Sequence, residues 1–272
     1  MTKLLLMIFG VIITILGLIL SFNIFKHYTV IFLIGWLFLM LFLNEKFFSN
    51  SNLKIIKNKY FILLLIFLGA IVTLIIEYIG VSISPAWIYS FNFFNFRFDF
   101  WFSIGAYIMY IPATYETYCL IKNITKIELK EKINHKKLMN IMLIISIALL
   151  ILPFIWSNEK YVGLPFCFFV IGLFFLFDFI NYKLSKSSII FNSLNNPKYL
   201  LIIIITSLAM SIPSEFTNII QYVWTYVNIP FIQFTIFKVP IIILIGWIPL
   251  VGLWINLFEI IISSLRQKKL SR

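Results

Sequence analysis

The chain has 272 residues, of which 62% are hydrophobic and only 12% are charged. A soluble domain needs more polar residues to cover its surface, so this composition excludes a soluble protein and indicates an integral membrane protein. The net charge of +12 falls in short segments beside the apolar runs, where lysines attract anionic lipid headgroups. We therefore expect membrane lipids, and no nucleic acid, as partners.

Apolar runs near the ~20 residues that a helix needs to cross a bilayer predict eight membrane spans. In chain order the spans cover about 4–25, 28–44, 60–80, 100–121, 138–156, 162–182, 199–221 and 238–262. The expected fold class is therefore all-α, a polytopic membrane protein with eight transmembrane helices.

The positions of the basic residues predict the orientation of these spans, because Lys and Arg near span ends are retained in the cytoplasm. With the N-terminus inside, 18 of the 22 basic residues fall on inner segments. The four outer ones are Lys26, Arg97, Lys160 and Lys238. We expect a multi-pass protein of the cell membrane with both termini cytoplasmic.

A pattern in the first half of the chain returns 137 to 138 residues later. A shift of 138 places Glu77 on Glu215. A shift of 137 matches Gly35 with Gly172, Asn44 with Asn181, Trp87 with Trp224, Tyr89 with Tyr226 and Pro112 with Pro249. Since four spans per half preserve direction, we predict two tandem four-helix halves in the same orientation, 1–137 and 138–272, within one integrated membrane domain. Such duplication often builds a membrane protein with a site between its halves.

The repeated aromatic residues fall in two outer connections, 81–99 and 222–237. Both are too apolar for solvated loops and too broken by Pro and Asn for spans, so we expect them at the outer interface. Single Trp and Tyr residues there are typical of an aromatic belt. Their recurring spacing equally suggests a pocket, for which Trp87, Tyr89, Trp224 and Tyr226 are the candidate substrate-binding residues.

Carboxyl groups inside the spans are few, and each is costly to bury, so each is expected to face a cavity or a partner. Glu77 and Glu215 lie near the outer ends of the third and seventh spans, and Glu116 lies lower in the fourth. A structural role, with Arg97 or Lys238 as counter-ion or with a hydrogen bond at a helix end, is one interpretation. The other is a catalytic acid that delivers a proton at neutral pH.

Two further carboxyls are less informative. Asp178 lies at a depth similar to that of Glu116, and the two could share a proton. Neither has a duplicate, because the shift of 137 takes Glu116 to Leu253 and brings Asp178 back to Leu41. Glu259 is expected to be solvated at the last inner boundary.

Several chemistries are excluded by absent motifs. The chain has no paired Asp-rich motifs for Mg²⁺ and diphosphate, no Gly-rich phosphate loop, no serine nucleophile elbow and no histidine box. Two isolated histidines predict no metal site, and we expect no cofactor. The carboxyls and aromatic residues that remain favour protonation of an apolar alkene, with aromatic faces stabilising the resulting carbocation.

These residues carry a resemblance. The stretch Glu77-Tyr-Ile-Gly80…Trp87-Ile-Tyr89…Ile111-Pro112, with its weaker repeat Glu215…Trp224-Thr-Tyr226…Pro240…Trp247-Ile-Pro249, resembles the integral-membrane carotenoid-modifying families. These are the lycopene cyclase domain and the carotenoid hydratases of the bisanhydrobacterioruberin hydratase kind. The resemblance implies a lipophilic polyene or isoprenoid substrate and a cofactor-free reaction, and adds Trp247 to the substrate-binding candidates.

The chain departs from the cyclases at their Pro-x-Glu-Glu motif. It has Pro112-Ala-Thr-Tyr-Glu116 and Pro249-Leu-Val-Gly instead. The resemblance therefore favours the hydratase branch, which adds water to a terminal double bond. Cyclisation or isomerisation, a member of the family without activity, and a non-enzymatic transporter or lipid-binding membrane protein are the alternatives.

Overall fold

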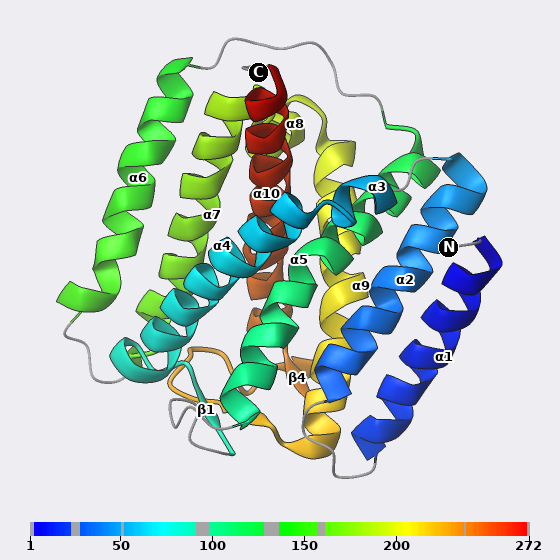
Figure 1. Ribbon diagram of the computed structural model, residues 1–272. Helices are drawn as coiled ribbons and strands as arrows, with labels where there is room; N and C mark the ends of the chain where they lie inside the picture. Colours follow the sequence, from blue (N-terminus) through cyan, green and yellow to red (C-terminus); the bar gives the residue numbers. More distant parts are fainter. Residues whose placement is uncertain are drawn as a thin grey trace.

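The computed structural model describes residues 3–22, 28–49, 52–90, 98–127, 136–156, 161–236 and 238–270 and is mostly helical (Figure 1). The long helices are α1 (Lys3–Phe22), α2 (Tyr28–Phe48), α4 (Lys59–Tyr78), α5 (Phe98–Thr125), α6 (Lys136–Ile155), α7 (Leu164–Ser185), α9 (Pro197–Gln221) and α10 (Ile241–Leu270). Each contains most of one predicted span. Helices are expected for such runs, because in lipid every backbone polar group must be satisfied within the segment.

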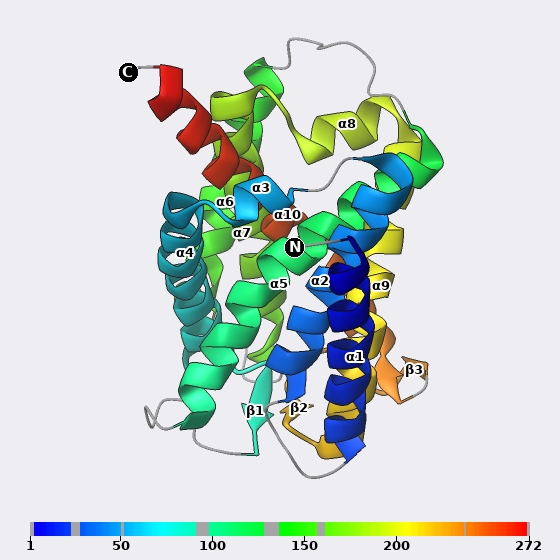
Figure 2. The ribbon, with the colours of Figure 1, turned by 45° about the vertical axis from the view of Figure 1, so that its right-hand side comes forward.

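Shorter elements gather at the two ends of the helices. They are α3 (Leu53–Ile56), the π-helix η1 (Ile79–Ile83), α8 (Ile189–Asn195), and the strands β1 (Trp87–Tyr89), β2 (Trp224–Tyr226), β3 (Thr235–Ile236) and β4 (Val239–Pro240). Figures 1 and 2 show α3 and α8 at the upper end and the strands at the lower end. We call these the α3/α8 end and the strand end.

Six helices within the described residues are long and apolar enough to cross a membrane. They are Thr29–Phe48, Lys59–Ile83, Lys137–Ile155, Leu164–Ser185, Pro197–Ile220 and Ile241–Arg266, and Leu4–Leu20 is a shorter apolar helix. α5, which is rich in Tyr and Thr, is not among the six. The outward faces support lipid contact, since Ile144, Ile147, Ile151 and Ile155 of α6 are all exposed. The fold is thus that of an all-α, multi-pass membrane protein, and the number eight stays a prediction.

The long helices form two sets that make equivalent contacts. The first set is α1, α2, α4 and α5, and the second set is α6, α7, α9 and α10. α1 packs on α2 as α6 packs on α7, α2 on α5 as α7 on α10, and α4 on α5 as α9 on α10. Across the two sets, α5 contacts both α9 and α10, and α10 also contacts α4. Figure 1 accordingly shows α1 and α6 on opposite flanks, with α5 and α10 between them.

The matched glycines Gly35 and Gly172 lie at equivalent packing points. A Cβ on Gly35 would lie 2.3 Å from the backbone nitrogen of Thr14 in α1, and one on Gly172 would lie 3.1 Å from the carbonyl oxygen of Ser146 in α6. The Ser146 hydroxyl donates to the Gly172 carbonyl at 2.8 Å. Small residues here let the first two helices of each set approach closely.

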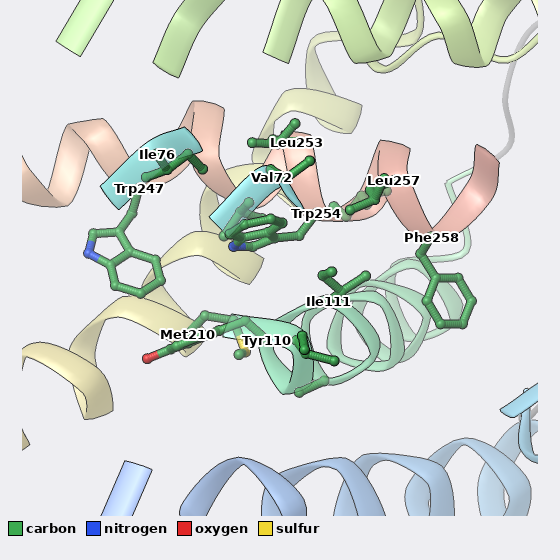
Figure 3. Close-up of a cluster of buried hydrophobic side chains, with 14 of the residues drawn as sticks. Val72, Ile76, Tyr110, Ile111, Met210, Trp247, Leu253, Trp254, Leu257 and Phe258 are labelled. Atoms are coloured by element: carbon green, nitrogen blue, oxygen red, sulfur yellow. The ribbon is translucent and has the colours of Figure 1, made fainter. Parts of the chain in front are cut away.

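The apolar core lies where α4, α5, α9 and α10 meet (Figure 3). Val72 of α4, Ile111 of α5, Met210 of α9 and Trp254 of α10 point into it (Figure 3) and are at most 5% exposed. The two sets of helices therefore share one core, and the strand-end residues lie beyond it at the lower end of the molecule in Figure 1.

Candidate functional site

The two repeated Trp-x-Tyr elements pair with each other. β1 and β2 form an antiparallel two-stranded sheet in which Trp87 opposes Tyr226 and Tyr89 opposes Trp224. Each Trp thus faces the Tyr of the other copy, the arrangement expected when two copies are related by a two-fold axis. The segments predicted to lie at the interface are therefore brought together at the strand end.

Each strand holds one of the duplicated carboxyls. The Tyr89 hydroxyl donates to Glu77 Oε1 at 2.9 Å, and the Tyr226 hydroxyl donates to Glu215 Oε1 at 2.6 Å. Glu77 is 0% and Glu215 is 1% exposed, so neither carboxyl points into lipid. Of the two counter-ions considered from sequence, Lys238 is exposed and Arg97 lies outside the described residues.

The one-residue difference between the two copies has a local cause. Trp87 follows Glu77 by ten positions in the sequence, and Trp224 follows Glu215 by nine. The extra residue falls where the π-helix η1 continues α4. A π turn closes from residue i to i+5 and so takes up one residue more than an α turn. The copies can then present their strands in the same way despite different spacing.

The π-helix also brings Gly80 against Trp87. A Cβ on Gly80 would lie 2.3 Å from Cη2 of the Trp87 ring, so glycine here lets the edge of the indole approach this turn. In the second copy the side chain of Asn218 holds the strand instead: its Nδ2 donates to the Trp224 carbonyl at 3.1 Å, and its Oδ1 accepts from the Trp224 N–H at 3.0 Å.

The surroundings of the two carboxyls differ. Trp247 Nε1 donates to Glu215 Oε1 at 2.9 Å, so this one oxygen accepts from both Trp247 and Tyr226. Around Glu77, Tyr107 and Trp87 also lie close, yet no described group brings a hydrogen bond to the buried Oε2. The pKa of Tyr226 is raised well above the usual tyrosine value, mainly by burial and secondly by the nearby Glu215 carboxyl. The Tyr226 hydroxyl therefore stays a donor.

A cavity of about 470 Å³ lies beside the paired strands, a size typical of small-molecule sites. It is lined by the five residues predicted to bind substrate, together with Glu215; these are Trp87, Tyr89, Trp224, Tyr226 and Trp247. Glu77 is not part of its wall and lies behind Tyr89. The wall is otherwise mainly apolar and comes mostly from α2, α5, α7 and α10, with Ile76 of α4. Glu215 is thus the predicted acid that the cavity exposes.

Glu116 lies away from this cavity, near the α3/α8 end. Its Oε2 accepts from Asn44 Nδ2 at 2.8 Å and its Oε1 from the backbone N–H of Asn52 at 3.3 Å. These bonds tie α5 to α2 and to the segment before α3. The contacts assign Glu116 a structural position, apart from the residues that line the cavity.

Glu116 has no duplicate at the shift of 137, as expected, but a carboxyl with an equivalent contact lies elsewhere in the second part of the chain. Asn181, the match of Asn44, donates to Glu259 Oε2 at 2.6 Å. Glu259 is therefore half-buried and hydrogen-bonded, not solvated as expected. The shift between Glu116 and Glu259 is 143 residues, so the last helices of the two sets keep the shift of 137 at Pro112 and Pro249 but not at these two carboxyls.

Asp178 also has a local partner. Its Oδ2 accepts from the Ser188 hydroxyl at 2.5 Å and its Oδ1 accepts from the Ile189 backbone N–H at 2.7 Å. Ser188 is the N-cap of α8, so Asp178 fastens this short helix to α7. The idea of a proton shared between Asp178 and Glu116 gains no support from these contacts.

Sequence reasoning missed the residues that complete the cavity. Tyr107 and Tyr110 of α5 line it three residues apart, and the Tyr110 hydroxyl lies 2.5 Å from Ser214 Oγ. The Tyr-x-x-Tyr spacing on one helix face was the available signal. Gly246 and Trp254 of α10 also line the cavity, and nothing in the repeat marks them.

Comparison with known proteins found no matching family model, no matching curated protein and no matching solved structure. Within the described residues, no three His, Cys, Asp or Glu side chains come together as a possible metal site. What the site offers chemically is one cavity-facing carboxyl, the hydroxyl and indole donors that hold it, and an aromatic wall.

Proposed function

We propose that this protein is a membrane enzyme that protonates a carbon–carbon double bond of a carotenoid or another isoprenoid polyene, without a cofactor. The observation that carries the proposal is the Glu215 carboxyl, which is fixed in the wall of an aromatic, apolar cavity with both of its donors on Oε1. The resemblance of the Glu…Trp-x-Tyr pattern to the carotenoid-modifying families supports the choice of substrate.

The hydrogen bonds suit a neutral carboxylic acid. In that form one oxygen is a carbonyl that accepts, and the other is a hydroxyl that donates. Oε1 accepts twice, from Tyr226 and Trp247, so the proton belongs on Oε2. A charged carboxylate in this mainly apolar wall would be costly, which favours the same form.

The reaction then follows from the residues present. The Oε2 proton adds to one carbon of the double bond, which leaves a carbocation on the other carbon and a carboxylate on Glu215. The faces of Trp87, Trp224 and Trp247 stabilise the cation by cation–π attraction. Loss of a proton from a neighbouring carbon gives a shifted double bond. Attack of a second double bond of the same chain on the cationic carbon, followed by loss of a proton from the new cation, gives a ring. Addition of water and release of its proton gives an alcohol. The released proton restores the acid.

The architecture we propose is eight spans in two tandem four-helix halves, with both termini in the cytoplasm. Three observations support the two halves. They are the equivalent helix contacts in the two sets, the β1–β2 pairing, and the hydrogen bonds from Asn44 to Glu116 and from Asn181 to Glu259. The orientation is supported by the lysines. Lys46 of α2 and Lys183 of α7, which are 137 residues apart, both lie at the α3/α8 end over the ring four residues earlier, Phe42 and Phe179.

The proposal is tested by expressing the protein in a host that accumulates lycopene or a C50 carotenoid precursor and reading pigment masses from the membrane extract. A gain of one water indicates hydration. An unchanged mass with altered retention indicates cyclisation or isomerisation. Pigments identical to those of the empty host, with every precursor tried, would contradict the proposal.

Two variants identify the acid in that experiment. Glu215→Gln keeps the acceptor for Tyr226 and Trp247 but has no proton to give, so product should be lost. Glu259→Gln makes the same change at the opposite end and keeps the Asn181 bond, so product should persist. A non-enzymatic protein that holds a lipid in the same cavity would yield no product with either variant or with the wild type.

A further inference from the structure

The cavity is not confined to one face of α10. Residues 245–250 all line it, and six consecutive residues of an α-helix point in every direction around its axis, since a turn holds 3.6 residues. Ile245 is 54% exposed, and Gly246 is exposed as well. The cavity therefore continues around α10 to its outer side, which faces lipid when α10 crosses the membrane.

Gly246 leaves the gap through which this continuation runs. A Cβ placed on Gly246 would meet nothing within 4 Å. The other helical glycines of the second set behave differently, because a Cβ would lie 3.0 Å from Leu149 at Gly172 and 2.5 Å from Phe174 at Gly252. Glycines in membrane helices commonly permit close packing. No described segment lies over the Cβ position of Gly246, and Gly246 lines the cavity, so the space it frees is part of the cavity.

The size of the cavity limits what can enter. About 470 Å³ lies in the lower part of the range of roughly 300–1,000 Å³ for sites that enclose a drug-sized ligand. A long polyene is larger, so only one end of it fits. The rest must lie outside the cavity, along the surface of α10.

We propose that Gly246 and Ile245 form a lateral portal through which an isoprenoid chain enters from the lipid, end first. The end group then lies beside Trp247, which follows Gly246 in the chain and bonds to Glu215. The remainder passes Gly246 and stays in the bilayer. This deepens the proposed function and rests on it for the reaction at the end group, whereas entry of the chain is independent of catalysis.

The portal is tested with all-trans-retinol, a short isoprenoid polyene, added to the protein in lipid nanodiscs. Energy transfer from the cavity tryptophans, which are Trp87, Trp224, Trp247 and Trp254, to retinol reports binding. Gly246→Phe fills the portal and should weaken retinol binding at least tenfold. Ile241→Phe adds a ring on the same helix outside the cavity wall and should change it less than twofold.

Gly246→Leu gives a second reading with a smaller side chain, which should weaken binding by an intermediate factor. Equal affinities of the wild type, the Leu variant and the Phe variant would overturn the portal, as would a wild type that binds no retinol saturably. Binding that persists in Ile241→Phe and is lost in Gly246→Phe upholds the portal even if no polyene product is ever detected, so the two proposals can fail separately.

Discussion

The charge of Glu215 can be read from the strength of its bond to Trp247. Trp247→Phe removes the Nε1 donor, which lies 2.9 Å from Glu215 Oε1, and leaves the Tyr226 bond to the same oxygen. A hydrogen bond between neutral groups contributes about 0.5–1.5 kcal/mol to stability, and one to a charged group about 1.5–3 kcal/mol. The change also shrinks the ring, which costs additional packing free energy.

A double-mutant cycle removes the packing contribution. In the Glu215→Gln background the amide carbonyl accepts from Trp247 as a neutral acid does. If Glu215 is neutral, Trp247→Phe should therefore cost the same free energy of unfolding in both backgrounds, with a coupling energy within about 0.5 kcal/mol of zero. If Glu215 is charged, the wild-type background should lose about 1 kcal/mol more.

The assay is unfolding of the purified protein in mixed micelles titrated with SDS, followed by circular dichroism, for the wild type, both single variants and the double variant. Trp254→Phe in the same two backgrounds is the matched control, because Trp254 is fully buried and no described group bonds its Nε1. Its coupling to Glu215 should be zero. A coupling above about 1 kcal/mol between Trp247 and Glu215 would refute the neutral acid.

Three further outcomes follow from the structure. Glu77→Gln should lower product formation less than Glu215→Gln does, because Glu77 lies behind Tyr89 and not in the cavity wall; equal losses in the pigment assay would contradict this. Gly80→Ala should destabilise the protein by about 1–3 kcal/mol, since the new methyl would displace the Trp87 ring; SDS unfolding measures it, and an unchanged midpoint would argue against the packing described. Asn44→Leu should cost about 1–3 kcal/mol by leaving the buried Glu116 carboxyl without its Nδ2 donor, while the product formed per molecule of folded protein stays the same.

The helices were predictable because a long apolar run in lipid has few alternatives to a helix. The residues at which the helices begin and end were less predictable. The prediction ended the last span at 262, yet α10 continues to Leu270. Lys and Arg are good helix formers and do not stop a helix. Glu259 already fell inside the predicted span, and its expected exposure to solvent was wrong because Asn181 of α7 packs beside it and donates to it.

The pairing of the two Trp-x-Tyr elements could not be predicted from the sequence. The repeat showed that the elements are alike, but pairing Trp87 with Tyr226 depends on how α5, α9 and α10 pack between the two sets of helices. The sequence shows that the shift changes from 138 at Glu77 and Glu215 to 137 at Trp87 and Trp224. Its cause, a π turn, requires the backbone.

The division of roles between the carboxyls could not be predicted either. Glu77 and Glu215 have the same neighbours in sequence, a Trp-x-Tyr element on the same side. Their difference comes from the helix that follows, where Trp247 supplies a donor to Glu215 and Tyr107 lies near Glu77. At the shift of 137 Tyr107 aligns with Leu244, so aligning the halves does not reveal this difference.

The account rests on transfer of a proton from Glu215 to a carbon atom, and solvent deuterium measures this directly. Membranes that contain the wild-type protein and an accumulated polyene are incubated in D₂O, the products are extracted into ordinary water, and their masses are determined. The account predicts one deuterium that does not wash out, bound to carbon in the product, and no such product with Glu215→Gln. Product that forms without deuterium on carbon would contradict it.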